Sequence, residues 1–170
     1  MDESTPRPGL PLPFLVLLAA AVGFILWSGR SLPLVVASHF DGAGRTNGHM
    51  PKALYLAVML LITALVPLLL VLIPRRALAG SVEHINVPNR GYWLAPERRA
   101  DTVRFLSRQM TLFAALLIVF LCYVQWLVVR ANELTPPSMS SRAFLIGLAV
   151  FLGCTFSWTL RVIRRFARPA

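Results

Sequence analysis

The chain has 170 residues, of which 56% are hydrophobic and 14% charged, and its formal net charge is +10. A soluble domain of this size covers its surface with polar groups, so this composition excludes an ordinary soluble fold. The basic residues flank apolar runs instead of lining a face that water reaches. This pattern indicates membrane topology and anionic lipid headgroups, and it argues against nucleic acid as a partner.

Four apolar runs are long enough to cross a membrane as helices. A bilayer core of about 30 Å needs about 20 apolar residues, because a helix rises ~1.5 Å per residue. The runs are residues 10–28, 53–73, 110–129 and 143–160, and none contains Asp, Glu, Lys, Arg or His. We therefore predict an all-α integral membrane protein, in which a four-helix bundle forms a single membrane domain over residues 1–170.

The segment between the first two runs is predicted to be an extracytoplasmic loop rich in glycine. His39, Asp41 and Gly44 form a first candidate ligand-binding group in it. His39 and Asp41 together with His49 could supply three metal ligands, but the glycines between them fix no geometry. We therefore assign no metal. We expect His39 to fold back over the bundle, with its ring buried and bonded to loop carbonyls.

The longest polar segment, residues 74–109, joins the second and third runs. Pro96 can open a helix here, with Val103, Leu106 and Met110 on one apolar face, so we predict an interfacial helix on the cytoplasmic side. A second candidate ligand-binding group has six members, which could converge on a pocket. They are Asn86, Asn89, Tyr92, Trp93, Glu97 and Arg98. The alternative interpretation is that this segment is a structural anchor on the membrane.

Small residues recur on one face of the fourth run. Ala149, Gly153 and Ser157 are four positions apart, which lets a neighbouring helix backbone approach closely. Packing inside the bundle is the favoured interpretation of this face, and a seam between two copies of the chain is the alternative.

The distribution of Lys and Arg predicts the orientation of the chain. Alternating the sides of the membrane places twelve basic residues with the two termini and the 74–109 segment, and five on the other side. The twelve are Arg7, Arg75, Arg76, Arg90, Arg98, Arg99, Arg104, Arg108, Arg161, Arg164, Arg165 and Arg168. Because cytoplasmic loops carry the excess of positive charge, both termini are expected in the cytoplasm.

One segment resembles a known family. LPLVVASHFDGAG, residues 32–44, resembles the LPxxVPxHFnxxG pattern of the bacterial DUF sixteen-forty-eight membrane protein family, which includes immunity proteins of the SdpI type. Ala37 and Asp41 depart from the pattern, in place of its second proline and its usual Asn. The positions that match are Leu32, Pro33, Val36, His39, Phe40 and Gly44.

The resemblance covers roughly residues 20–75, and INVPNRGYWLAPERR at 85–99 also looks like a segment of family members. The family's usual Asp-Gly-Trp is replaced here by Asn47-Gly48-His49. The family has no general biochemical assignment, so the resemblance implies an immunity-like role by analogy alone. It also implies a bacterial cytoplasmic (inner) membrane as the location.

The sequence contains no GxSxG, HExxH, P-loop or dinucleotide motif, and no paired carboxylates. We therefore expect no enzyme, no catalytic residue and no cofactor, and a binding, accessory or immunity-like role. The expected partners are membrane lipids and a membrane protein or a second copy of the chain. The alternative is a transporter or lipid-handling subunit, which would need a polar route past Gln125. A membrane enzyme working at the interface is a weaker third interpretation.

Overall fold

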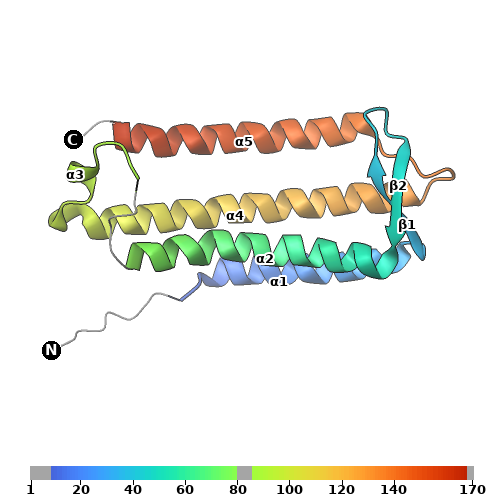
Figure 1. Cartoon of the computed structure of the whole chain (residues 1–170), viewed down its shortest axis with the longest axis horizontal. Helices are drawn as coiled ribbons and strands as arrows, with labels where there is room; N and C mark the ends of the chain where they lie inside the picture. The colour runs from blue at the N-terminus through green and yellow to red at the C-terminus, as the bar shows by residue number, and fades with distance from the viewer. Residues whose placement is uncertain (1–8, 80–85, 168–170) are drawn as a thin grey trace.

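The computed structural model describes residues 9–79 and 86–167, and its four long helices run side by side (Figure 1). Within those ranges α1, α2, α4 and α5 are long and apolar enough to cross a membrane, and each falls on one predicted run. The elements are α1 (Leu12–Ser28), η1 (Gly29–Ser31), β1 (Val35–Phe40), β2 (Thr46–Pro51), α2 (Lys52–Ala79), α3 (Arg90–Trp93), α4 (Pro96–Asn132) and α5 (Ser141–Ala167).

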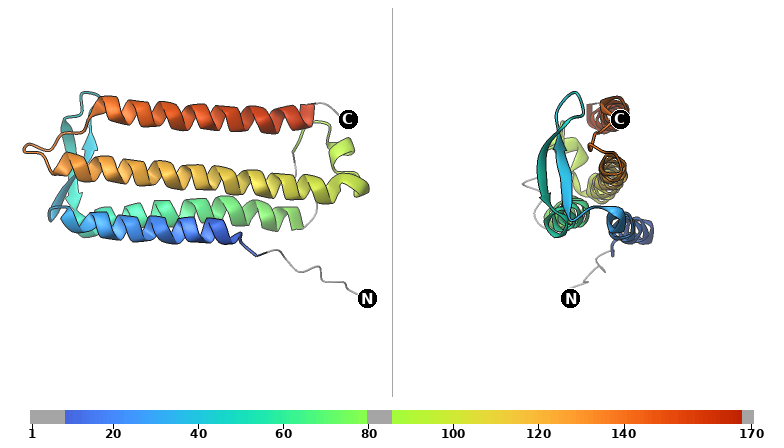
Figure 2. Two further views of the ribbon diagram at one scale, coloured as in Figure 1. Left: turned by 180° about the vertical axis from the view of Figure 1, so that it is seen from behind. Right: turned by 90° about the vertical axis from the view of Figure 1, so that its right-hand side faces the viewer.

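Helix α4 organises the bundle. It packs against α1, α2 and α5, and α1 also packs against α2, whereas α5 has no comparable contact with α1 or α2 (Figure 2). The expected four-helix bundle is confirmed in its four long helices, of which α1, α2 and α4 pack together and α5 packs against α4. Aromatic side chains hold α5 in place, because Phe120 stacks on Phe151 and Phe113 stacks on Trp158.

The small residues of α5 do not face the bundle. Ala149, Gly153 and Ser157 are all exposed, so the prediction that this face packs inside the bundle is wrong. A different glycine makes the close approach to α4. A Cβ added at Gly147 would lie 2.1 Å from the ring of Tyr123. The spacing of small residues is visible in the sequence. It does not predict whether the face with Gly147 or the face with Gly153 packs against another helix.

The predicted extracytoplasmic loop is a β-hairpin, so the all-α class is also corrected. Strands β1 and β2 pair antiparallel, from Val35 opposite Pro51 to Phe40 opposite Thr46, with irregularities on either side of His39. Val36 and Ala37 are buried against the helices, which gives β1 an inner surface. The hairpin covers one end of the bundle, and we call this the outer end (Figure 1).

The predicted interfacial helix is part of α4. This helix has 37 residues and runs unbroken from Pro96 to Asn132, about 55 Å at ~1.5 Å per residue. The segment predicted to lie on the membrane is thus collinear with the third apolar run (Figure 1). Helix α1 begins and α5 ends at the end opposite the hairpin, which we call the inner end. Arg7 and Arg168 lie outside the described residues.

Candidate functional site

One amide side chain bonds the hairpin to the end of α4. The Asn132 Oδ1 atom accepts the N–H of Ala37 at 2.9 Å, and its Nδ2 donates to the Ala37 carbonyl at 3.0 Å. The same Nδ2 donates to the Val128 carbonyl one turn back in α4, at 2.9 Å. Asn132 therefore pairs with β1 as a residue of a third strand would, and it satisfies backbone groups of a residue that is 1% exposed.

Asp41 shapes the hairpin tip. Its Oδ1 accepts the N–H groups of Ala43 and Arg45, each at 2.9 Å, and its Oδ2 accepts the Arg45 Nε at 2.9 Å. The bond from the Arg45 N–H outweighs partial desolvation and holds the pKa of Asp41 below its usual value, and the Arg45 guanidinium and the Ala43 N–H add to this effect. The carboxylate thus holds a turn together.

Gly44 joins the hairpin tip to the segment before α5. Its carbonyl accepts the Met139 N–H at 2.9 Å and the Ser138 hydroxyl at 3.3 Å. Two residues further on, the Thr46 hydroxyl donates to the Pro137 carbonyl at 2.8 Å. The conformation of Gly44, with φ of 80°, is one that favours glycine.

His39 does not fold over the bundle, so that expectation is wrong. It is exposed, and its Nδ1 lies 3.0 Å from the Ser38 hydroxyl, with the ring beside Gly48 on the opposite strand. The register places His39 opposite Gly48 and His49 opposite Ala37. Across the described ranges, no three His, Cys, Asp or Glu residues are close enough to hold a metal ion, His39, Asp41 and His49 included.

At the inner end, four of the six predicted pocket residues lie together, and two of them, Asn89 and Trp93, contact the last turn of α5. The Asn89 Nδ2 and the Trp93 Nε1 both donate to the Phe166 carbonyl, at 2.9 and 3.3 Å. The Thr102 hydroxyl in turn donates to the Trp93 carbonyl at 2.8 Å. The last carbonyls of a helix lack partners within that helix. Asn89 and α3 therefore cap the C-terminal end of α5. Asn89 has a left-handed backbone, with φ of 53°.

Arginine–aromatic contacts complete this inner cap. The Arg98 guanidinium lies 4.1 Å from the centre of the Tyr92 ring, and that of Arg165 lies 4.6 Å from the Phe105 ring. Asn86 and Glu97 are exposed and form no hydrogen bond or ion pair with a described residue. Asn89, Tyr92, Trp93 and Arg98 are therefore brought together in a cap on a helix end, and both the ligand pocket and the anchor on the membrane stay predictions.

A buried polar trio links the three central helices. The Tyr55 hydroxyl donates to the Gln125 Oε1 at 2.7 Å, and the Gln125 Nε2 donates to the Ser28 hydroxyl at 3.1 Å. The Ser28 hydroxyl donates in turn to the Ile25 carbonyl. Gln125 is fully buried, and both ends of its amide are bonded to neighbouring helices. The sequence suggested Gln125 as a polar group in the bundle, but its partners are 70 and 97 positions away.

Two of the hollows on the described part of the bundle stand out, and neither is lined by Gln125. The first, of about 480 Å³, follows α5. The second, of about 240 Å³, lies between α1 and α4. Its lining is almost wholly apolar: Leu17, Ala20, Ala21, Phe24, Ile118, Val119 and Cys122. A polar route through the bundle, which the transporter interpretation requires, is therefore not provided by either hollow.

No protein-family model, curated protein or solved structure matches the chain. The resemblance of residues 32–44 to the immunity-protein family therefore stays a prediction. The structure gives a structural role to three of the matching positions. Of its matching positions, Leu32 and Val36 belong to the core of the outer end, and Gly44 holds the hairpin tip.

The lowered pKa of Asp41 predicts a pH-dependent hairpin tip. A carboxyl group with a lower pKa in the folded state adds stability above its unfolded pKa of about 4, and this contribution is lost as pH falls through the folded pKa. Asp41→Asn keeps an oxygen for the two backbone N–H groups but loses the charge. In detergent, the advantage in Tm of the parent over this variant should be full at about pH 6 and shrink below about pH 4.

The control for this experiment is Asp101→Asn, which removes an exposed carboxylate lying 3.6 Å from the Arg104 guanidinium. This control separates the loss of the hydrogen bonds in the Asp41 turn from the general effect of removing one negative charge. An advantage of the parent over Asp41→Asn that is equally large at about pH 3 and pH 6 would contradict the assignment.

Proposed function

We propose that the protein is a non-enzymatic component of the bacterial cytoplasmic membrane that binds a partner protein at its outer end, in an accessory or immunity-like role. The observation that carries the proposal is a firmly attached platform that exposes large apolar side chains. Leu34 is 86% exposed and Val35 60%, directly before and at the start of β1, and Leu134 is 55% exposed just after α4. Exposed apolar groups on an ordered surface mark interaction sites.

The platform is ordered by contacts from three parts of the chain. Asn132 holds β1, Gly44 holds the 137–139 segment, and the Lys52 ammonium donates to the carbonyls of Arg30 and Leu32 at 3.0 and 2.9 Å. A surface that is already ordered loses little conformational entropy when a partner binds. This supports recognition by a preformed surface, and the family resemblance of the same segment points the same way.

The test is chemical cross-linking in membranes of the native host, followed by purification in mild detergent and identification of the cross-linked protein. We expect the parent to capture a membrane or secreted protein, and Leu34→Ser to lose it. The matched control is Ile163→Ser, since Ile163 is 52% exposed at the inner end. Recovery of the chain alone under all conditions, or equal capture by both variants, would refute binding at the outer end.

The orientation that this function requires has both termini in the cytoplasm. The twelve-to-five distribution of basic residues supports it, as does the placement of α1's start and α5's end at one end of the bundle (Figure 1). In a background without Cys122 and Cys154, an impermeant thiol reagent should label Asn47→Cys in whole cells. Asn86→Cys should react only after permeabilisation. Labelling of Asn86→Cys alone in whole cells would reverse the topology.

A further inference from the structure

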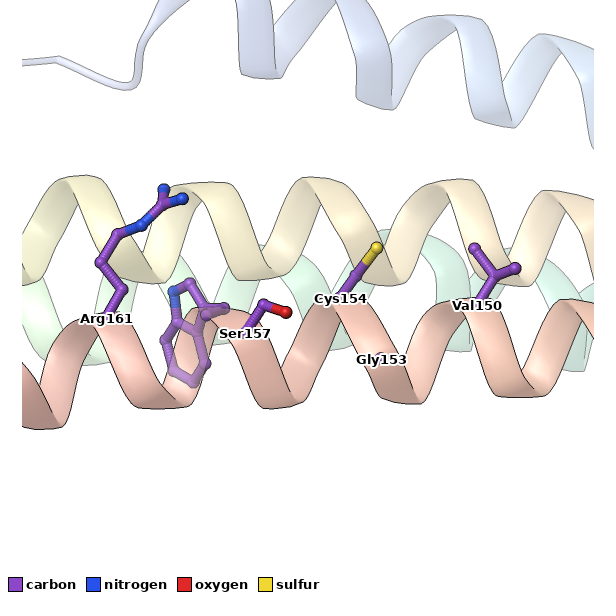
Figure 3. Close-up of a pocket in the computed structure, with 6 residues that line it drawn as sticks. Val150, Gly153, Cys154, Ser157 and Arg161 are labelled. Atoms are coloured by element: carbon purple, nitrogen blue, oxygen red, sulfur yellow. The ribbon is translucent and has the colours of Figure 1, made fainter.

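A groove runs along the flank of α5 that borders its contact with α4, where Trp158 stacks on Phe113. It has a volume of about 480 Å³ and is lined by Val150, Gly153, Cys154, Ser157, Trp158 and Arg161. Val150, Cys154, Ser157 and Arg161 follow the spacing of one helical face, and the side chains of Val150, Cys154 and Arg161 point to the same side (Figure 3). Gly153 contributes no side chain, and a Cβ placed there would meet nothing within 4 Å.

The groove has the length of one membrane leaflet. Val150 and Arg161 are eleven residues apart, about 17 Å along a helix, while half of a ~30 Å hydrocarbon core is about 15 Å. Arg161 is the first charged residue after the apolar run 143–160, so it marks the level at which hydrocarbon gives way to headgroups. The groove therefore extends from the headgroup level at the inner end towards the middle of the bilayer.

The charge at its inner end is not neutralised by any residue that the structure describes. Arg161 is exposed and forms no ion pair with a described residue. Arg165, one turn further on, differs because its guanidinium lies over the rings of Phe105 and Trp93. A cation at headgroup depth with an apolar groove leading inward from it matches an anionic phospholipid, which carries a phosphate above an acyl chain.

We propose that this groove binds an anionic phospholipid, with its phosphate on the Arg161 guanidinium and one acyl chain lying over Gly153 towards Val150. Ser157, one turn deeper than Arg161, offers a hydroxyl near the ester linkage. The site is independent of the outer-end partner and does not rest on the proposed function.

A second copy of the chain fits this groove less well. Two copies in one membrane share their orientation, and a two-fold axis along the membrane normal would place the same residues at the same depth on both sides of the seam. Arg161 of each copy would then approach the other, and like charges repel most strongly near a low-dielectric region. The charge of the groove thus favours a lipid over a copy of α5.

The test is native mass spectrometry of the full chain in detergent, with phosphatidylglycerol and phosphatidylcholine of the same acyl chains added in competition. We expect the parent to retain one phosphatidylglycerol in preference to phosphatidylcholine. Arg161→Gln should reduce that preference about fivefold, the effect of one arginine near a membrane surface. The matched control, Arg164→Gln, changes an exposed arginine outside the groove and should keep the preference. Inorganic phosphate added alone should not compete.

Filling the groove tests the acyl-chain half of the proposal. Gly153→Leu should fold normally, because its Cβ points into open space, and should lose the retained lipid of either headgroup. Equal loss of preference in Arg161→Gln and Arg164→Gln would mean diffuse surface charge and would overturn the proposal. Full competition by phosphate would show a site for the anion alone. Unchanged lipid binding by Gly153→Leu, with a dimer of the parent converted to monomer, would assign this face to a second copy.

Discussion

Asn132→Ala is expected to lower the free energy of unfolding by about 2–4 kcal/mol, because it leaves a buried N–H and a buried carbonyl of Ala37 without partners. Each orphaned group costs ~1–3 kcal/mol when water cannot reach it. Ala37 is 1% exposed, so water cannot easily replace the amide. The hairpin should also loosen, since Asn132 is its bond to the end of α4. Thermal unfolding in detergent and hydrogen exchange of the hairpin would measure the two effects.

The matched control is Asn47→Ala, which truncates an exposed asparagine on β2 of the same hairpin. Its effect should be small, because no hydrogen bond of its side chain is seen with the described residues. If the two variants unfold at the same temperature, Asn132 does not hold the hairpin, and the outer platform must depend on other contacts. If Asn132→Ala loosens the hairpin but leaves partner capture intact, the ordered platform is not what the partner recognises.

The membrane-spanning helices could be predicted from the sequence because their signal is local. Four uncharged apolar runs of sufficient length satisfy a condition on consecutive residues, and no distant contact is needed to read it. The packing of α5 could not be predicted from this local signal. Lipid-facing and helix-facing residues of a membrane helix are both apolar, so the pattern cannot distinguish Gly147, which meets Tyr123, from Gly153, which meets nothing.

The hairpin could not be predicted because its determinants are non-local. β1 is six residues long and irregular near His39, and its burial depends on helices α2 and α4, which pack against it. Asn132, which pairs with it, is 95 positions away from Ala37. The segment was predicted to be a glycine-rich loop, and a glycine-rich loop and the tip of a hairpin use the same residues. The sequence therefore predicted a connection of the right composition without the strands beside it.

The inner candidate group shows a related ambiguity. Asn89, Tyr92, Trp93 and Arg98 do come together, as a group of polar and aromatic residues on one short segment should. The common target of Asn89 and Trp93 is the Phe166 carbonyl at the end of α5, 77 and 73 positions later. Tyr92 packs on Trp93, and Arg98 lies over Tyr92. A helix end needs hydrogen-bond donors just as a ligand does, so the residue types alone predicted a binding group and could not name what it binds.

Gly44→Ala is expected to destabilise the outer end by about 2–4 kcal/mol, because two energetic costs add at this residue. Its φ of 80° costs an L-residue about 1–2 kcal/mol. Its Cβ would lie 2.0 Å from the Met139 carbonyl oxygen, a backbone atom that cannot move aside without breaking the 2.9 Å bond from the Met139 N–H to the Gly44 carbonyl. The hairpin tip and the 137–139 segment should therefore separate.

Gly42→Ala is the matched control, because it adds the same methyl group two residues away, where nothing lies within 4 Å. A large loss of Tm for Gly44→Ala and almost none for Gly42→Ala would establish that the glycine of the family-like segment is needed for backbone geometry. Partner capture should then fall with stability. If Gly44→Ala is as stable as Gly42→Ala yet no longer captures the partner, the glycine instead provides room for a bound partner. His39, Asp41 and Gly44 would then belong to a binding surface.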